Sequence, residues 1–446
     1  SSSVKPAVKP CLLLVLAAWV SACGQGAPDA RAPAPALDVA AESYVRLVLA
    51  LGERDADSLD SYHGPPAWQA EARTRRATLN DIRIAAVSLA ESLSSAPGAN
   101  GEDEVRRMFL IRQLRAVVAR IDIVRGARPP FAEELRALFG LDVAPQVTGV
   151  ADAHDTSAPS VRAAIDRLLP GTGPLGARYA AFDRRFLVAP DRLARVLSRA
   201  IDGCRAATRA HISLSPTERV DVEYAPDLAW SAFTRYQGRF TSRIQVNASL
   251  PLTVDRALDL ACHEGYPGHH TIDSLLDARF GGQRIELVVR PLFSPQSLLH
   301  EAASSVAGEL AFPGPARLAF ERDQLFGLAG LDPSEADRYV RVGRLVDQLR
   351  GVQAHIARRY LDGELDFPRA SAALERDALM PSADASLKFL NRFRTYAATY
   401  MDGRSTFSRY LDARSPRDDD GTGRWRAYIN VVTDPSQVVP SEPLPK

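Results

Sequence analysis

Apolar residues recur at helical spacing along most of the chain. Pro, Gly and Ser residues interrupt this pattern and divide it into four long helical stretches, at residues 38–56, 66–94, 102–126 and 190–210. Between residues 218 and 247 the period changes to two, which is typical of strands, in Arg219–Tyr224 and Arg243–Asn247. The pattern predicts a mainly helical protein with one small sheet.

Length and composition are those of a globular protein with a large core. The chain has 446 residues, of which 46% are hydrophobic and 24% charged, and its formal net charge is +1. This balance provides no charge excess for binding nucleic acid or an anionic membrane surface. We expect a mainly α fold with an N-terminal helical lobe at 38–215 and a second lobe, with the small sheet, at 216–446.

The first residues are typical of an exported bacterial protein. Lys5 and Lys9 precede an apolar run at 11–20 that is too short to span a bilayer comfortably. Val20-Ser21-Ala22-Cys23 fits a lipobox, which predicts a signal peptide at 1–22 and a lipid-anchored flexible tether at 23–37. The lipid on Cys23 would anchor the protein to a membrane of the bacterial cell envelope. The alternative is a plain signal peptide or anchor.

Two cysteines remain beyond the lipobox, Cys204 and Cys262. Cys262 directly precedes a histidine-rich motif, and we expect it to be a small buried apolar residue. A disulfide with Cys204 is the alternative.

The motif itself reads Cys262-His263-Glu264-Gly265-Tyr266-Pro267-Gly268-His269-His270. A histidine followed by a glutamate suits zinc hydrolysis, because the imidazole holds the metal and the carboxylate takes a proton from water. The usual His-Glu-x-x-His motif places both histidines on one helical face, but here position i+4 is Pro267.

A regular helix would turn His269 about 240° away from His263. Pro267 and Gly268 predict a kink or bulge over 265–268 that brings His269 back beside His263. His270 competes for the role of second ligand. The alternative to a metal site is two helices with surface histidines at a Pro-Gly joint.

The motif and its flanks resemble a family of bacterial proteins. His-Glu-Gly-Tyr-Pro-Gly-His-His looks like the signature of the domain-of-unknown-function 885 family. The likeness continues in Trp230–Phe233, Tyr236–Gly238, Ile244–Asn247 and Pro291–Leu299, and it covers about residues 220–400. The family's members are mostly helical, often lipoproteins, and are regarded as zinc metallopeptidases of the gluzincin kind. The resemblance therefore implies a zinc peptidase.

A downstream carboxylate on another helix would complete the metal site. The stretch at 300–309 offers Glu301 and Glu309, and small residues after Glu301 favour close helix packing. The resemblance implies that Glu301 is the ligand, because the family's matching stretch begins with a glutamate there. Glu309 would then support the ligands. His300, an alternative ligand, points about 100° away from Glu301 and is expected to face substrate or solvent.

A hydrolase also needs a group that stabilises the developing oxyanion. The candidates are His270 and a late helical segment that contains Arg392, Arg394, Tyr396 and Tyr400. The arginines also suit a substrate carboxylate. The resemblance implies a tyrosine soon after Pro381, where this chain has Leu387, so that role is not carried over. An amphipathic helix with snorkelling arginines is the alternative.

Together these features predict a Zn²⁺-dependent hydrolase with a cleft between helical lobes. His263, His269 and Glu301 would hold the metal, Glu264 would be the general base, and His270, Arg394 and Tyr396 would assist. The expected substrate is a peptide or small amide.

One strand is a candidate for contact with that substrate. Ile244–Ala248 would be an edge strand that pairs with the substrate backbone, or else part of a packing hairpin. Two alternatives to a peptidase stay open: a metal enzyme for a non-peptide amide or other small molecule, and a non-catalytic helical lipoprotein. The sequence predicts no oligomeric state.

Overall fold

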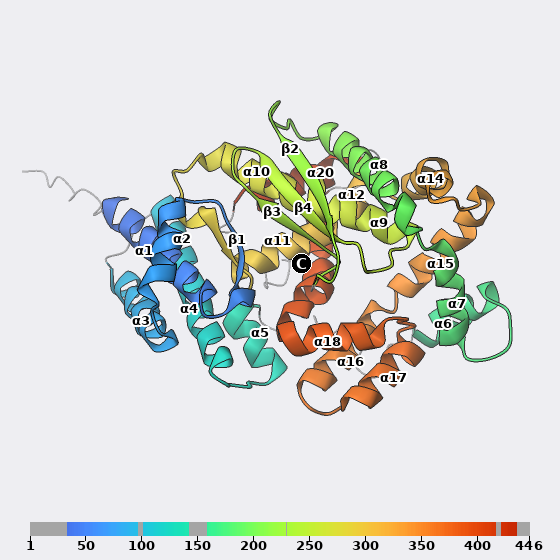
Figure 1. Ribbon diagram of the computed structural model, residues 1–446, viewed down its shortest axis with the longest axis horizontal. Coiled ribbons are helices and arrows are strands. Elements are labelled where there is room, and N and C mark those ends of the chain that lie inside the picture. Colours follow the sequence, from blue (N-terminus) through green and yellow to red (C-terminus); the bar gives the residue numbers. More distant parts are fainter. Residues whose placement is uncertain (1–33, 97–100, 142–157, 229, 416–420, 435–446) are drawn as a thin grey trace, which may run out of the picture.

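The computed structural model describes residues 34–96, 101–141, 158–228, 230–415 and 421–434. Helices dominate these residues, and one three-stranded and one two-stranded sheet accompany them (Figure 1). The predicted mainly α fold with a small sheet beside a kinked helix is confirmed. The predicted signal peptide, Cys23 and most of the tether lie outside the described residues.

The N-terminal helices lie together and are blue to cyan in Figure 1. They are α1 (Ala34–Gly52), α2 (Pro66–Arg75), α3 (Leu79–Ser95), α4 (Glu102–Val124) and α5 (Phe131–Phe139). The single helix predicted over 66–94 is wrong. Arg76 ends α2 in a left-handed conformation, with a φ of 49°. Thr78 then begins α3, because its side chain and that of Asp81 form a capping box.

Three helices lead from there to the three-stranded sheet: α6 (Ala158–Leu168), α7 (Leu175–Asp183) and α8 (Pro190–Arg209). The apolar stripe of α8 repeats at helical spacing, and Val196, Leu197 and Ala200 on it are buried. This stripe faces the helix that carries the histidine motif.

The three-stranded sheet has the order β2-β4-β3, in which β2 (Arg219–Ala225) runs parallel and β3 (Ala232–Tyr236) antiparallel to β4 (Thr241–Asn247). The prediction that Ile244–Ala248 forms an edge strand is therefore wrong. Ile244 pairs with Val222 on one side and with Thr234 on the other, because β3 covers the second side of β4. A separate antiparallel pair joins β1 (Leu59–Tyr62) to β5 (Val289–Pro291).

The motif helix is interrupted as the sequence predicted. A regular helix α9 (Val254–Leu260) widens into one π-helical turn, η3 (Ala261–Gly265), and the chain resumes as α10 (His269–Phe280). The helices α11 (Pro295–Ser305) and α12 (Ala307–Ala311) follow. The interruption begins earlier than the predicted 265–268, because the π turn precedes the Pro-Gly pair.

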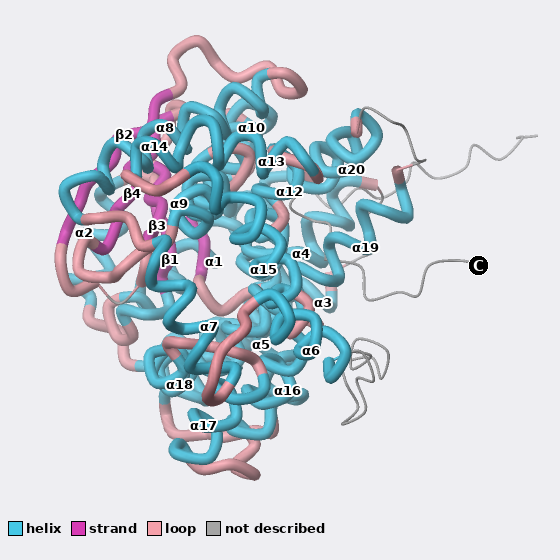
Figure 2. Tube along the Cα trace, turned by 90° about the vertical axis from the view of Figure 1, so that its right-hand side faces the viewer, coloured by secondary structure: helices cyan, strands magenta, loops and turns pink. Residues whose placement is uncertain are grey.

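The remaining helices complete the fold. They are α13 (Pro315–Phe320), α14 (Gly327–Ala329), α15 (Ala336–Asp347), α16 (Arg350–Leu361), α17 (Phe367–Asp377), α18 (Ala383–Phe393), α19 (Arg404–Arg414) and α20 (Thr422–Val432), with further π turns η5 (Glu321–Phe326) and η8 (Thr399–Gly403). Helices α16, α17 and α18 form one group in Figure 1. Figure 2 shows the strands near one face, with α19 and α20 toward the opposite face.

Apolar clusters bring together residues that are far apart in the sequence. One contains Phe139, Leu299 and Tyr428, and another contains Tyr44, Leu114 and Val289. Both clusters join the two stretches that the sequence analysis assigned to separate lobes. The division into lobes at residue 215 stays a prediction.

Cys204 and Cys262 form a disulfide, so the expectation of a free buried Cys262 is wrong. Cys204 lies on α8 and Cys262 on η3, and both are fully buried. Packing of the two apolar faces brings their Cα atoms to 5.4 Å, within the range of a disulfide. The bond ties the π turn to α8 across 58 residues of sequence.

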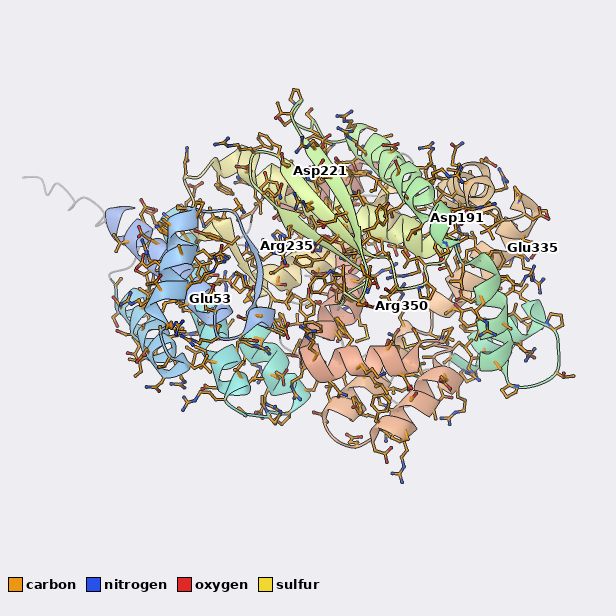
Figure 3. All side chains as sticks on the ribbon, viewed as in Figure 1. Glu53, Asp191, Asp221, Arg235, Glu335 and Arg350 are labelled. Atoms are coloured by element: carbon orange, nitrogen blue, oxygen red, sulfur yellow. A yellow bond between two sulfur atoms is a disulfide. The ribbon has the colours of Figure 1, made fainter. Side chains whose placement is uncertain are left out.

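Charged side chains of both signs are spread over the surface. Figure 3 labels acids and arginines on separate elements, among them Asp191 on α8, Asp221 on β2 and Arg235 on β3. Among the described helices, none combines the length and apolar character that crossing a bilayer requires.

Candidate metal centre

Two features bring the histidines of the motif together. The π turn shifts the positions of His263 and Glu264 on the helix, and the chain then turns back sharply at Gly268. The amide N–H of Gly268 donates to the carbonyl of Cys262 at 3.0 Å. A Cβ at position 268 would lie 1.8 Å from the carbonyl oxygen of His263, so only glycine allows this close approach. Gly268 acts through this lack of bulk, since its φ is an ordinary −71°.

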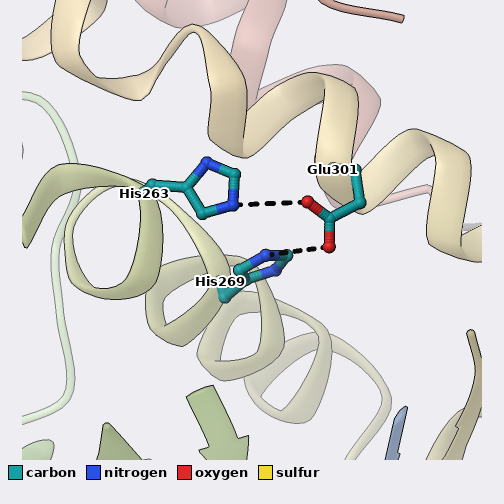
Figure 4. A group of neighbouring side chains, drawn as sticks. All are labelled: His263, His269 and Glu301. Atoms are coloured by element: carbon teal, nitrogen blue, oxygen red, sulfur yellow. Dashed lines mark ion pairs between the residues drawn. The ribbon is translucent and has the colours of Figure 1, made fainter. Parts of the chain in front are cut away.

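His263, His269 and Glu301 form one compact group, with each possible ligand atom within 4.8 Å of the others. Nε2 of His263 lies 3.3 Å from Oε2 of Glu301, and Nε2 of His269 lies 3.3 Å from Oε1 (Figure 4). The two imidazole rings stand nearly perpendicular, with centroids 4.8 Å apart. Figure 4 shows Glu301 reaching the histidines from a second helix, α11.

The charges within this group favour a bound cation. Burial alone would raise the pKa of the Glu301 carboxyl, but His269 and His263 hold it well below its usual range. Burial alone would lower the pKa of His269, but Glu301 raises it to about 9. Glu301 therefore favours positive charge where the three ligand atoms converge, which is the charge that a metal ion would supply.

The donor set also fits a metal. Oε2 of Glu301 is buried and has no hydrogen-bond partner among the described residues. Two imidazoles and one carboxylate are the ligands of many catalytic zinc sites, in which a fourth position stays open for water or substrate. Residues His263, His269 and Glu301 thus fit a zinc ion by chemistry and by proximity.

Glu264 lies beside the group without belonging to it. Its side chain is buried, and Oε2 accepts a 2.7 Å hydrogen bond from the hydroxyl of Thr234 on β3. The same hydroxyl lies 2.9 Å from the Glu264 backbone carbonyl, an alternative acceptor. When the Thr234 hydroxyl donates to Oε2, it sets the direction of the carboxylate. Sequence reasoning missed Thr234, because nothing in its strand separates it from other inward-facing residues.

Tyr396 and Tyr400 complete the surroundings of the group. The Tyr396 hydroxyl donates a 2.8 Å hydrogen bond to Oε1 of Glu301. Burial and the charge of Glu301 raise the pKa of Tyr396 well above its ordinary value, which keeps it a donor. The Tyr400 hydroxyl lies 3.3 Å from that of Tyr396, and the Tyr400 ring centroid lies 6.0 Å from that of His263.

The structure does not bring His270 into the metal group. Its Nδ1 lies 2.8 Å from the Ser242 hydroxyl and its Nε2 lies 3.2 Å from Oε2 of Glu218. Glu218 is buried, yet hydrogen bonds from His270, Tyr266 and Arg205 lower its pKa to about 2. His270 therefore belongs to a buried polar network that joins the motif to β4. Sequence reasoning missed Glu218 and Ser242, which lie outside the motif.

Arg394 also lies outside the group. Its guanidinium pairs with the buried carboxylate of Glu134 on α5 at 2.7 Å, and Thr395 binds the other oxygen of that carboxylate. Arg392 pairs with Asp57. Both arginines are thus engaged in contacts between helices, away from the metal group.

His300 is buried on α11, so the expectation that it faces solvent is wrong, while a role toward substrate stays a prediction. Nδ1 of His300 lies 2.8 Å from the guanidinium of Arg290, and burial together with that charge lowers the pKa of His300 to about 3. Glu309 pairs with Arg404 on α19 and lies on the separate helix α12.

No protein-family model and no curated protein matches this chain. Among solved structures, a candidate lipoprotein from Colwellia psychrerythraea aligns at 16% identity with a TM-score of 0.49, over 82% of this chain and 69% of that one. A candidate lipoprotein of unknown function from Shewanella oneidensis aligns at 13% with a TM-score of 0.43, over 83% and 76%. Trypanosoma cruzi metallocarboxypeptidase 1 aligns at 14% with a TM-score of 0.44, over 90% of each chain.

Identities this low leave the chemistry of the site to be judged from the residues of this chain. The resemblance to the domain-of-unknown-function 885 family stays a prediction.

Proposed function

We propose that this protein is a zinc-dependent hydrolase that cleaves peptides. One observation carries the proposal: two histidines and a glutamate converge within 4.8 Å, and a second, oriented glutamate lies next to them in the chain. A structural zinc site has four protein ligands and needs no further carboxylate. Three ligands with an adjacent carboxylate are the arrangement of a hydrolytic site.

The residues of the metal group and their neighbours each have a defined role in this proposal. A zinc ion held by His263, His269 and Glu301 would supply Lewis-acid activation of water and of the substrate carbonyl. Glu264 takes a proton from the attacking water and delivers it to the leaving amine. Thr234 holds the Glu264 carboxylate in position for both transfers. The hydroxyl of Thr234 donates to one carboxylate oxygen, which leaves the other as the proton acceptor.

Tyr400 is the group that we assign to the developing oxyanion. Burial raises the pKa of Tyr400 well above the ordinary value. Its hydroxyl donates to that of Tyr396 over a long 3.3 Å, a hydrogen bond that it would exchange for one to the oxyanion. The hydroxyl of Tyr396 is already committed to Glu301. Arg394 and His270, the other candidates, have partners elsewhere.

A lipid anchor at the cell envelope is part of the proposal and is supported by Val20-Ser21-Ala22-Cys23. Cys23→Ala should release the protein from the membrane fraction or block its processing. A variant that fractionates and migrates like the parent would contradict the anchor and leave the hydrolase proposal untouched.

Metal analysis combined with a peptide-library assay tests the hydrolase proposal. The purified protein should contain zinc at close to one ion per chain and should cleave peptides only when the metal is present. Cleavage confined to non-peptide amides would favour the alternative substrate class. A zinc-loaded protein that cleaves neither peptides nor amides would contradict the proposal and favour a binding protein.

A further inference from the structure

A small apolar pocket lies between the late helices, and Tyr400, whose ring neighbours that of His263, is one of its walls. The pocket has a volume of about 130 Å³. Its buried wall is formed by Leu374 on α17 and Leu390 on α18, and its half-buried mouth by Gln353, Tyr400 and Met401. A single water needs only about 10–15 Å³ of such space, so the pocket accommodates a group of several heavy atoms.

Tyr400 is the residue that the pocket shares with the surroundings of the metal group. The same ring that walls the pocket has its centroid 6.0 Å from that of His263. Its hydroxyl lies 3.3 Å from that of Tyr396, which is bonded to Glu301. A chain of direct contacts thus leads from the metal ligands to the pocket.

The lining of the pocket selects the chemistry of its occupant. None of the described lining residues carries a formal charge, and the polar ones, Gln353, Ser386 and Tyr400, are neutral. A charged side chain would lose its hydration there without gaining a charged partner. Burial of such an unpaired charge is strongly unfavourable. An apolar side chain gains binding free energy with each methylene that it buries there.

We infer that this pocket binds an apolar side chain of the substrate, of the size of leucine, methionine or phenylalanine, next to the scissile bond. The inference rests on the proposed hydrolase function, and it adds the substrate class. The enzyme prefers peptides with a medium-sized apolar residue at that position over peptides with an acidic or basic one there.

Two substitutions at the mouth of the pocket test this inference. Gln353→Glu changes the charge with almost no change in shape, and Met401→Ala enlarges the space. Each is compared with a matched control outside the pocket: Gln348→Glu, which is exposed and adds the same charge, and Met108→Ala, which packs on the separate apolar cluster around α1 and α4. Two peptide sets are used, varied at the residue before and at the residue after the scissile bond.

The measured quantity is kcat/KM for each peptide. In the parent, apolar residues should exceed Asp and Lys by at least about tenfold on one side of the bond. Gln353→Glu should lower the rate with leucine and raise that with lysine, and Met401→Ala should shift the preference from leucine toward phenylalanine. The controls should keep the parental order. Equal preferences in parent and pocket variants, with hydrolysis intact, would overturn the pocket assignment.

A binding measurement separates this inference from the hydrolase proposal. Calorimetric titration of the zinc-loaded Glu264→Gln protein, which the proposed mechanism leaves unable to cleave, with the same peptides reports recognition alone. Apolar peptides that bind more tightly, with a preference that changes when Gln353→Glu is added, support the pocket even if the parent cleaves nothing, and in that case only the proposed activity fails. Peptides that bind without regard to this side chain, or do not bind, overturn the pocket.

Discussion

The hydroxyl of Tyr396 donates a 2.8 Å hydrogen bond to Oε1 of Glu301, the oxygen that also lies 3.3 Å from Nε2 of His269. The bond holds the carboxylate with its other oxygen toward His263. A tyrosine 95 residues away in the sequence thereby sets the direction of a proposed metal ligand. Partners of this kind orient metal ligands and tune their affinity.

Tyr396→Phe should therefore weaken zinc binding while leaving the fold in place. Loss of an outer partner typically costs about 10–100-fold in metal affinity or activity. Competition with a chelator of known affinity measures the change. Tyr360→Phe is the matched control, because its hydroxyl binds only the exposed side chain of Asn391. Unchanged zinc affinity in Tyr396→Phe would mean that Glu301 needs no such support.

Substitution of the ligands should remove the metal itself. We expect His263→Ala and Glu301→Ala to lose most bound zinc, since each takes away one of three converging ligands. His270→Ala is the decisive comparison, because His270 is adjacent to His269 but faces Ser242 and Glu218. Metal content per chain in the folded variants gives the answer. Full zinc in His269→Ala, with loss in His270→Ala, would reverse the assignment.

The disulfide should stabilise the fold around the metal group. For a closed loop of about 58 residues, the chain-entropy model gives roughly 4 kcal/mol of stabilisation. Cys204→Ser should therefore unfold at lower denaturant concentration than the parent. Reducing agent should lower the stability of the parent toward that of the variant and have no effect on the variant. A parent that is equally stable with and without reductant would contradict this role.

The stability of the protein should fall between about pH 5 and pH 8 through Glu321. Burial raises the pKa of this carboxyl to about 7, although Arg317 opposes the shift. The folded protein then holds a proton that the unfolded chain has lost, so this contribution is present below the unfolded pKa and disappears as pH rises through 7. Its size is roughly 3 kcal/mol at most.

Glu321→Gln tests that contribution, because a neutral amide has no titration in this range. The drop in the free energy of unfolding between pH 5 and pH 8 should be smaller in the variant than in the parent. Glu91→Gln serves as the control, since Glu91 is exposed on α3. Identical pH profiles in parent and Glu321→Gln would show that the carboxyl titrates normally in the folded state.

Local sequence patterns predicted most of the helices, the interruption of the motif helix, and the proximity of His263 and His269. Pro267 and Gly268 carried the kink, because both act on the backbone at their own positions. The π turn at 261–265 had no such mark. The break at Arg76 does have a sequence signal, because Thr78 and Asp81 match a capping box, but the apolar period continues across the break and conceals it.

What escaped prediction depends on contacts between distant segments. β4 is the central strand because β3 pairs with its second side. The five residues of β3 alternate too weakly for the sequence to predict this strand. The disulfide required the packing of α8 on η3. Three side chains proposed for the site instead pair with distant acidic residues: Arg394 with Glu134, His270 with Glu218, and Arg392 with Asp57. No spacing in the sequence predicts such pairs.

Glu264→Gln is the most direct test of the proposed chemistry. The amide keeps the shape of the side chain and its contact with Thr234 but cannot take a proton from water. Loss of a general base typically costs about 10²–10⁴ in rate. Glu309→Gln, a glutamate paired with Arg404 outside the metal group, is the matched control.

The measurement is zinc content and peptide hydrolysis on the same preparations of parent, Glu264→Gln and Glu309→Gln. The proposed function predicts full zinc in all three proteins and a loss of hydrolysis of at least about 100-fold in Glu264→Gln alone. A Glu264→Gln protein that retains both zinc and the parental rate would contradict the role of Glu264 and with it the proposed mechanism.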